Sequence, residues 1–282
     1  MKLLIEPSTK NNLYSDYVDG IILPLENYAV ESIISFSLAE IKKITKSSNC
    51  EVFIKINKNI LNEDIDDLTS ILKELDKLNI SGIFFYDLAV LELKNELKLK
   101  TDLVWNQTHM VNNYRTCDYY FKHGVKYALL GKEITLEEII EIINKSKITS
   151  MVEVVSKPSV AFSKRKLVTN YYQDLGKSIN TDITVREKIT DTNYEFIEDS
   201  NGTSIFLDKI TNGTSVIKDL YEANCQYIIF REYGIDNFKD LVIDTKKYIK
   251  DKCIDDKYII KYKKLGDRTN FFFKKTIYRV KK

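Results

Sequence analysis

Cysteine, histidine, proline and glycine are all scarce in this chain, and each shortage narrows the range of functions. The 282 residues include four cysteines, two histidines, three prolines and nine glycines. No Cys-x-x-Cys pair or histidine cluster is present, so the sequence predicts neither a zinc site nor a disulfide framework. No glycine-rich phosphate-binding loop is present either. Isolated thiols are typical of a reducing compartment, and we expect the protein to be cytoplasmic.

Long hydrophobic runs are also absent. No run reaches the roughly 18 apolar residues of a membrane-spanning helix, and the N-terminus meets Glu6 and Pro7 after a short apolar segment. We therefore expect no membrane partner and no secretory signal. The formal net charge of +2 neither favours nor excludes nucleic acid. The stretch 257–282 is rich in lysine and arginine, which suits either phosphate contact or a solvated strand face.

Eight short apolar runs, separated by segments with helical periodicity, dominate what is present. Each run has the continuous apolar character of a strand buried in a parallel sheet. Helical patterns between them include 64–78, 135–143 and 235–249. This alternation predicts an α/β fold, a (β/α)8 TIM-like barrel, with a doubly wound open sheet as the alternative. The runs are Leu3–Ile5, Gly20–Leu23, Val52–Ile56, Gly82–Tyr86, Asp102–Trp105, Lys126–Leu130, Met151–Val155 and Tyr227–Phe230.

The predicted barrel occupies residues 1–252, and one of its connections is unusually long. About seventy residues separate the seventh and eighth runs. Within 156–215, Asn201-Gly202 stands between two strand patterns and predicts a β-hairpin. We expect this insertion to lie over one barrel mouth. The C-terminal tail, 253–282, is predicted to be basic and β-rich, with strands at Tyr258–Tyr262 and Phe271–Val280.

Candidate catalytic residues follow from the rule that barrel active sites lie at the carboxyl ends of the strands. Asp87 and Glu133 would form a carboxylate pair for acid–base chemistry. The alternatives are that Asp87 caps the next helix and that Glu133 pairs with a lysine. Lys132 would bind an anionic substrate, or it is an ordinary surface lysine. His109 is a candidate general base, although a single histidine is more often structural.

Further candidate binding residues lie in the insertion and after the eighth run. Lys164 and Arg165 stand near Asn170 and suit a phosphate or carboxylate, with two following tyrosines available to stack on a base. Arg231 follows the eighth run directly and belongs to the same predicted substrate-binding set.

Several short segments occur in a characteristic order along the chain. They are Gly82–Ala89, Trp105–Tyr114, His123–Ile139, Met151–Val154, Phe162–Tyr172, Ile197–Ser204 and Asn270–Val280. In this order they resemble peptidase family U32, also called the collagenase-like proteases. The resemblance implies a (β/α) barrel. It also implies substrate-binding roles for Thr108, which stands where the family has Gln or Glu, and for Asn113.

The chain departs from this family at the positions that would bind a cofactor. Many members hold an iron–sulfur cluster on four cysteines. Where members have His-Gly followed by a cysteine, this sequence has Val155-Ser156 and Ser159. The family's arginine before glutamate is Lys132 here, and a lysine does not reproduce bidentate recognition. The resemblance therefore implies that the cluster ligands are lost, and we expect no cofactor.

Within the family, the chain is most similar to shorter, cluster-poor members that take part in forming 5-hydroxyuridine at the tRNA wobble position. The leading hypothesis is a tRNA-modification factor that binds tRNA or a small anionic ligand and works with a cluster-bearing paralogue. Lys132, Lys164, Arg165 and Arg231 would bind the anion. A collagenase-like peptidase and a non-catalytic scaffold subunit are the alternatives.

Overall fold

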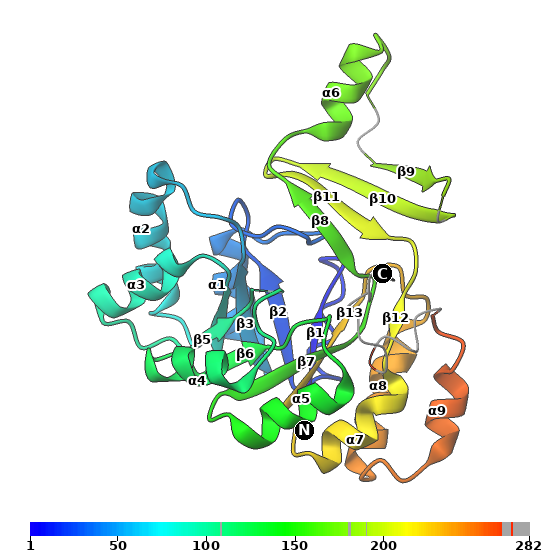
Figure 1. Ribbon diagram of the computed structural model, residues 1–282. Helices are drawn as coiled ribbons and strands as arrows, with labels where there is room; N and C mark the ends of the chain where they lie inside the picture. Colours follow the sequence, from blue (N-terminus) through cyan, green and yellow to red (C-terminus); the bar gives the residue numbers. More distant parts are fainter. Residues whose placement is uncertain (108, 180–181, 190, 267–271, 273–282) are drawn as a thin grey trace, which may run out of the picture.

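The eight apolar runs all form strands, and these strands pair in parallel into one closed barrel (Figure 1). The computed structural model describes residues 1–107, 109–179, 182–189, 191–266 and 272. The strand order is β7-β13-β1-β2-β3-β4-β5-β6, and pairing of β6 with β7 closes the ring. The predicted barrel is confirmed, and the open-sheet alternative is wrong. The strands are β1 (Lys2–Glu6), β2 (Gly20–Pro24), β3 (Glu51–Ile56), β4 (Gly82–Phe85), β5 (Leu103–Trp105), β6 (Tyr127–Leu129), β7 (Thr149–Ser156) and β13 (Tyr227–Arg231).

Helices follow most of the strands and surround the barrel. Local signals fix their ends: Thr135 and Glu138 form a capping box at the start of α5. His123 ends α4 before Gly124, whose φ of 87° is readily adopted by glycine. None of the described helices is long and apolar enough to cross a membrane. Apart from the helices of the insertion and the tail, they are α1 (Leu38–Ser47), η1 (Asn62–Asp64), α2 (Ile65–Leu75), α3 (Leu88–Leu97), α4 (Tyr114–Lys122), α5 (Leu136–Lys145), η2 (Thr214–Val216), α7 (Ile217–Glu222) and α8 (Phe238–Lys250).

The barrel lumen is filled by side chains and forms a core of its own. Successive strand residues point to opposite faces, so alternate positions on the eight strands point inward. Phe53 meets Phe84, Tyr127 and Tyr227 edge to face, with ring centroids 5.8 to 6.1 Å apart. The lumen is therefore closed, and only its rim can accept a ligand. The lumen residues are Leu4, Ile22, Phe53, Phe84, Val104, Tyr127, Leu129, Met151, Tyr227 and Ile229.

The long connection between β7 and β13 forms a second, antiparallel sheet that projects from the barrel (Figure 1). The order in this sheet is β8-β11-β10-β9. The predicted hairpin is confirmed, since Asp199 pairs with Gly202 at its turn. The short strand β12 returns the chain to the barrel by pairing with β7. The insertion comprises β8 (Ser159–Ser163), α6 (Leu167–Asp174), β9 (Asp182–Glu187), β10 (Thr192–Asp199), β11 (Gly202–Leu207) and β12 (Thr211–Asn212).

The tail begins with a helix, so the predicted strand at Tyr258–Tyr262 is wrong. Helix α9 (Asp256–Tyr262) starts at Asp255, whose side chain accepts a hydrogen bond from the Lys257 amide. Tyr258 and Tyr262, four residues apart, are both buried, whereas Ile260 is 71% exposed. A strand would have placed all three side chains on one face. The predicted strand at 271–280 lies outside the described residues, except for Phe272.

Replacing Tyr258 by alanine tests the packing of this helix. Tyr258 stacks on Tyr248 of α8 at 4.3 Å between centroids, and its hydroxyl lies 2.7 Å from the Thr245 hydroxyl. We expect Tyr258→Ala to lower the free energy of unfolding by about 3 to 5 kcal/mol. The exposed control Ile260→Ala should change it by less than about 0.5 kcal/mol. Urea unfolding measures both, and equal effects would contradict the helical packing.

Candidate functional site at the carboxyl ends of the strands

A layer of charged side chains lies directly above the apolar lumen, at the carboxyl ends of four barrel strands. Glu6, Lys55, Glu153 and Arg231 each follow a lumen residue of β1, β3, β7 or β13 by two positions. Because side chains two apart on a strand share a face, all four point into the barrel. Enzymes with this fold place their active sites at this end. The layer is therefore the strongest site candidate in the described chain.

On one side of the layer, Lys55 is held by a complete set of acceptors. Its ammonium lies 3.1 and 3.3 Å from the two oxygens of Glu6 and donates to the Ser32 hydroxyl at 2.7 Å. The Glu31 carbonyl accepts a further bond at 3.2 Å, and Ser32 in turn donates to Glu6 at 2.9 Å. Lys55 is only 1% exposed. These contacts assign Lys55 to holding the layer together.

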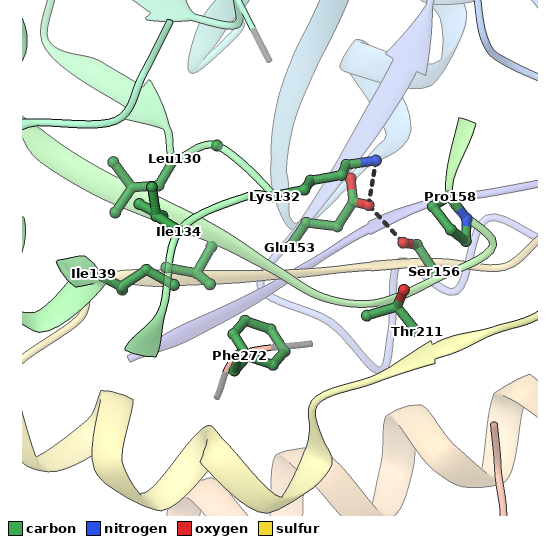
Figure 2. A pocket seen from close by; sticks show the side chains of 11 residues that line it. Leu130, Lys132, Ile134, Ile139, Glu153, Ser156, Pro158, Thr211 and Phe272 are labelled. Atoms are coloured by element: carbon green, nitrogen blue, oxygen red, sulfur yellow. Dashed lines mark hydrogen bonds and ion pairs between the residues drawn. The ribbon is translucent and has the colours of Figure 1, made fainter. Parts of the chain in front are cut away.

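On the other side, Arg231 joins the two carboxylates of the layer. Its Nη1 lies 3.1 Å from Glu6, and its Nε donates to Glu153 at 2.6 Å. Glu153 also accepts from Lys132, at 2.7 Å, and from the Ser156 hydroxyl, at 2.5 Å (Figure 2). The structure thus brings together two of the predicted binding residues, Lys132 and Arg231, through a shared carboxylate.

Burial and neighbouring charges shift the ionisation of these groups in a consistent way. Burial raises the pKa of the Glu153 carboxyl, but the charges of Arg231 and Lys132 outweigh it and hold that pKa at about 2. Burial also opposes ionisation of Glu6, and Arg231 and Lys55 still lower its pKa. Desolvation lowers the pKa of Lys55 to about 8, against the attraction of Glu6. Both carboxylates are therefore ionised at neutral pH.

The charges at the mouth are nearly balanced when these groups are ionised. Three cations, Lys55, Lys132 and Arg231, stand against the carboxylates of Glu6 and Glu153, and the Glu31 carboxylate also attracts Lys55 and Arg231. Side chains of Lys132 and Arg231 remain 20% and 16% exposed, whereas Lys55 is sealed. An anionic group arriving from solvent would meet the two partly exposed cations first. The site is chemically suited to a phosphate or a carboxylate.

The insertion forms one wall beside this layer. Lys157 pairs with Glu195 of β10 at 2.6 Å, and the Tyr233 hydroxyl donates to the same carboxylate at 2.7 Å. The Tyr233 ring packs edge to face against Phe206 of β11 with centroids 5.4 Å apart. A small, open depression lies here, lined by residues of the layer and of the insertion. The mouth is thus bounded by the second sheet, as the sequence predicts.

A neighbouring small, open depression lies on the far side of Glu153 (Figure 2). Its polar wall is Lys132, Glu153 and Ser156, and Leu130, Ile134 and Ile139, from the β6–α5 connection and α5, form the apolar wall. Phe272 closes it and is only 3% exposed. A Cβ on Gly213 would come within 2.3 Å of the Phe272 ring. The glycine therefore makes room for that ring.

The predicted acid–base pair has separate partners. The Asp87 carboxylate caps α3 by accepting from the Ala89 amide at 3.0 Å, and it also accepts from the Ile60 amide at 3.0 Å. The sequence alternative of a helix cap is thus the contact observed. Glu133 is half exposed, and its carboxylate lies 3.5 Å from the His109 ring nitrogen. Catalytic roles for Asp87 and Glu133 remain predictions.

The other predicted residues are spread over the rim and the insertion. Asn113 caps α4 by accepting from the Thr116 amide at 2.9 Å. Lys164 and Arg165 are exposed in the turn between β8 and α6, and Asn170 is exposed on α6. Thr108 lies outside the described residues. The predicted binding set therefore divides between the barrel mouth and the insertion.

Two central members of the layer, Lys55 and Glu153, were not among the sequence candidates. Both lie inside apolar runs, FIKI and MVEVV, rather than at the polar strand ends. A charged residue inside a doubly buried strand is costly unless it is paired. Charges of opposite sign within two such runs are the signal that would have identified them.

The four thiols lie on separate elements of the fold. Cys50 precedes β3, Cys117 is in α4, Cys225 precedes β13 and Cys253 follows α8. Burial raises the pKa of both Cys117 and Cys225 to about 12. Within the described part of the chain, no group of three or more His, Cys, Asp or Glu side chains is placed to hold a metal ion. The four thiols do not fit a four-cysteine cluster, and the expected lack of a cofactor stays a prediction.

Comparisons with known proteins place these features in a family context. The model of peptidase family U32 matches residues 13–235. The chain is 26% identical to tRNA hydroxylation protein P2 of Bacillus subtilis (strain 168) over 235 residues, covering 79% of this chain and 73% of that protein. It is 22% identical to tRNA hydroxylation protein P1 of the same organism over 146 residues, covering 52% of this chain and 33% of that protein.

Among solved structures, 3-hexulose-6-phosphate synthase from Salmonella typhimurium superimposes with a TM-score of 0.48 at 11% identity. The alignment covers 89% of this chain and 98% of that one. A chitinase from Rhizomucor miehei gives a TM-score of 0.45 at 10% identity, covering 88% and 99%.

Replacing Glu153 by glutamine tests the ionic layer. Losing this carboxylate leaves Lys132 and Arg231 without their shared partner, so we expect Glu153→Gln to cost about 3 to 5 kcal/mol of unfolding free energy near pH 7. The control Glu141→Gln removes an exposed carboxylate paired with Lys145 and should cost less than about 1 kcal/mol. Urea titrations followed by circular dichroism measure both, and equal costs would contradict a buried layer.

The difference in unfolding free energy between the wild type and Glu153→Gln should depend on pH with a definite sign. Because folding lowers the pKa of Glu153 from 4.5 to about 2, its ionised form stabilises the native state above pH 4.5. That contribution, about 3 kcal/mol, is lost as the pH falls from 4.5 towards 2. The difference in stability between the wild type and Glu153→Gln should therefore shrink over this range. A difference that stays constant would refute the ionised pair.

Proposed function

This chain belongs to peptidase family U32, and we propose that within it the protein acts in tRNA modification, as a factor or subunit in forming 5-hydroxyuridine. The similarity to tRNA hydroxylation protein P2, which runs through 79% of the chain, carries the proposal. The second similar protein, tRNA hydroxylation protein P1, supports the same function. These two relatives favour RNA modification over peptide hydrolysis, the activity in the family's description.

The charged layer supplies the chemistry that such a role requires at the barrel mouth. Arg231 and Lys132 would attract the anionic group of a small ligand or an RNA phosphate to a place bounded by the insertion. Glu6 and Glu153 would hold those cations in position, because removing either carboxylate releases one contact of Arg231. Asp87, Asn113 and Glu133 stand on the rim and would orient the ligand.

A second family member fits this proposal as a partner. Tertiary structure does not bring the thiols of this chain into a cluster-binding set, so a cluster-bearing paralogue would supply any redox centre. Two related tRNA hydroxylation proteins in one organism, P1 and P2, support a division of labour between paralogues. A cytoplasmic location, where tRNA is available, belongs to the same proposal.

Nucleoside mass spectrometry of bulk tRNA tests the function directly. We expect a strain lacking the gene to lose 5-hydroxyuridine and its derivatives, and the intact gene to restore them. Complementation with Arg231→Lys should restore much less, since a lysine cannot keep both carboxylate contacts. The control Lys73→Gln, on the outer helix α2, should restore the wild-type level at equal protein abundance. Unchanged 5-hydroxyuridine in the deletion strain would refute the proposal.

A further inference from the structure

The insertion sheet has two different faces. Residues that pair across antiparallel strands point to the same side, so Glu195 and Phe206 share a face, and Ser204 lies on it two residues along β11. This inner face is fixed to the barrel: Glu195 binds Lys157 and Tyr233, and the Ser204 hydroxyl accepts from the Glu31 amide at 3.2 Å. The sheet is therefore held in one position beside the mouth.

The outer face carries apolar side chains outside the two barrel cores, and the start of α6 covers its hairpin end, where Thr203 and Val168 are buried. One cross-strand row runs from Ala161 through Ile205 and Phe196 to Ile183, and pairing between Tyr194 and Val185 adds a second. None of these residues belongs to either hydrophobic core. Ala161 and Val185 are exposed, and the rest are half-buried. Single-layer sheets of this kind leave an apolar face for a ligand.

Two aromatic rings on this outer face suit unpaired bases. Tyr194 and Phe196 are two residues apart on β10 and therefore project from the same side, about 7 Å apart along the strand. Sheets that recognise single-stranded RNA stack two or three bases on aromatic side chains arranged in this way. Stacking tolerates any base, because every base has a π face.

Three consecutive cations cross one end of the same face. The Thr203 hydroxyl, which points outward beside Glu198, donates to the Arg165 carbonyl at 2.9 Å and accepts from the Leu167 amide at 3.0 Å. The turn that holds Lys164, Arg165 and Lys166 therefore passes over the outer face. All three side chains are exposed, and among the described residues none of them forms an ion pair.

The acidic residues nearby balance these cations only in part. Glu198 and Asp199 accept hydrogen bonds from neutral groups and so keep their negative charge, and the Asp64 carboxylate of η1 attracts Lys164. Glu198 accepts from the amides of Val168 and Thr169 and from the Thr169 hydroxyl. Asp199 accepts from the amides of the hairpin turn, and Glu195 is bound on the inner face. A row of aromatic rings ending at a cationic turn is complementary to the bases and phosphates of one nucleic acid strand. A protein partner would be disfavoured by lysines at its contact.

We propose that the outer face of the insertion sheet binds an unpaired RNA strand. Bases stack on Phe196 and Tyr194, and the strand's phosphates lie against Lys164 and Arg165. The identity of that strand as a tRNA anticodon loop rests on the proposed function. The face itself is defined independently, by the register of β8, β9, β10 and β11. It lies apart from the ionic layer, so binding of the strand and chemistry at the mouth are separable.

Fluorescence anisotropy with the intact purified protein tests this surface. The probe is a labelled 17-nucleotide anticodon stem-loop, and the comparison is a fully paired RNA duplex of the same length. Phe196→Leu keeps apolar volume and removes the π face, so we expect it to weaken stem-loop binding about tenfold and leave duplex binding unchanged. The matched control Ile205→Leu, on the same cross-strand row, should bind as the wild type does.

The cations are tested by charge-matched double variants. Lys164→Gln with Arg165→Gln should weaken binding and reduce the slope of log affinity against log salt by about one to two. Lys43→Gln with Lys73→Gln, which removes the same charge from exposed positions on α1 and α2, should alter neither. Wild-type affinity in the Phe196→Leu and Lys164/Arg165 variants, or no stem-loop binding by the intact protein, would overturn the inference.

The outcomes separate this inference from the proposed function. If gene deletion abolishes 5-hydroxyuridine but Phe196→Leu leaves stem-loop binding unchanged, the proposed function is supported and the RNA-binding surface is refuted. If stem-loop binding depends on Phe196 but deletion of the gene leaves the tRNA nucleosides unchanged, the RNA-binding surface is supported and the proposed function is refuted. If a second protein instead covers this face, Phe196→Leu will weaken that complex and not the RNA complex, which also overturns the inference.

Discussion

The contact of Arg231 with two carboxylates is the constraint on which the rest of the site depends. Folding largely removes Arg231, Glu6 and Glu153 from solvent, because they lie above a barrel lumen that is packed with apolar and aromatic side chains. Such burial is tolerated only when each charge has its partners in place. The partners come from adjacent strands β7, β13 and β1, so the parallel register of the barrel determines the geometry of the layer. Lys132 and Lys55 complete the layer from either side.

The cations that the sequence predicts as one binding set lie in two separate places, the barrel mouth and the insertion sheet. Lys132 and Arg231 lie in the mouth and are oriented by carboxylates, which suits a small anionic group held in a defined position. Lys164 and Arg165 lie on the outer side of a separate sheet beside aromatic rings, which suits a longer polymer. The salt bridge between Lys157 and Glu195 connects the two regions. A macromolecular substrate could thus be held by the insertion while one of its groups reaches the mouth.

Much of the fold is predictable from the sequence, because each barrel strand is an uninterrupted apolar run and helical periodicity separates most of them. The hairpin and the caps of α4 and α5 follow from local residue preferences. The ionic layer was not predicted, since Lys55 and Glu153 resemble interruptions of apolar runs until the fold brings Lys55 beside Glu6 and Glu153 beside Arg231. Helix α9 was assigned as a strand because its β-branched and aromatic residues fit either period, and only Tyr248 of α8 decides between them.

Photo-crosslinking from the wobble position tests the central claim that the barrel mouth and the insertion act together on tRNA. A 4-thiouridine placed there in an anticodon stem-loop would be irradiated with the intact protein, and the crosslinked peptides would be identified by mass spectrometry. The account predicts crosslinks from the wobble base to segments 130–134 or 231–233, and from neighbouring loop positions to β10. Crosslinks confined to the outer helices α1 to α4 would contradict it.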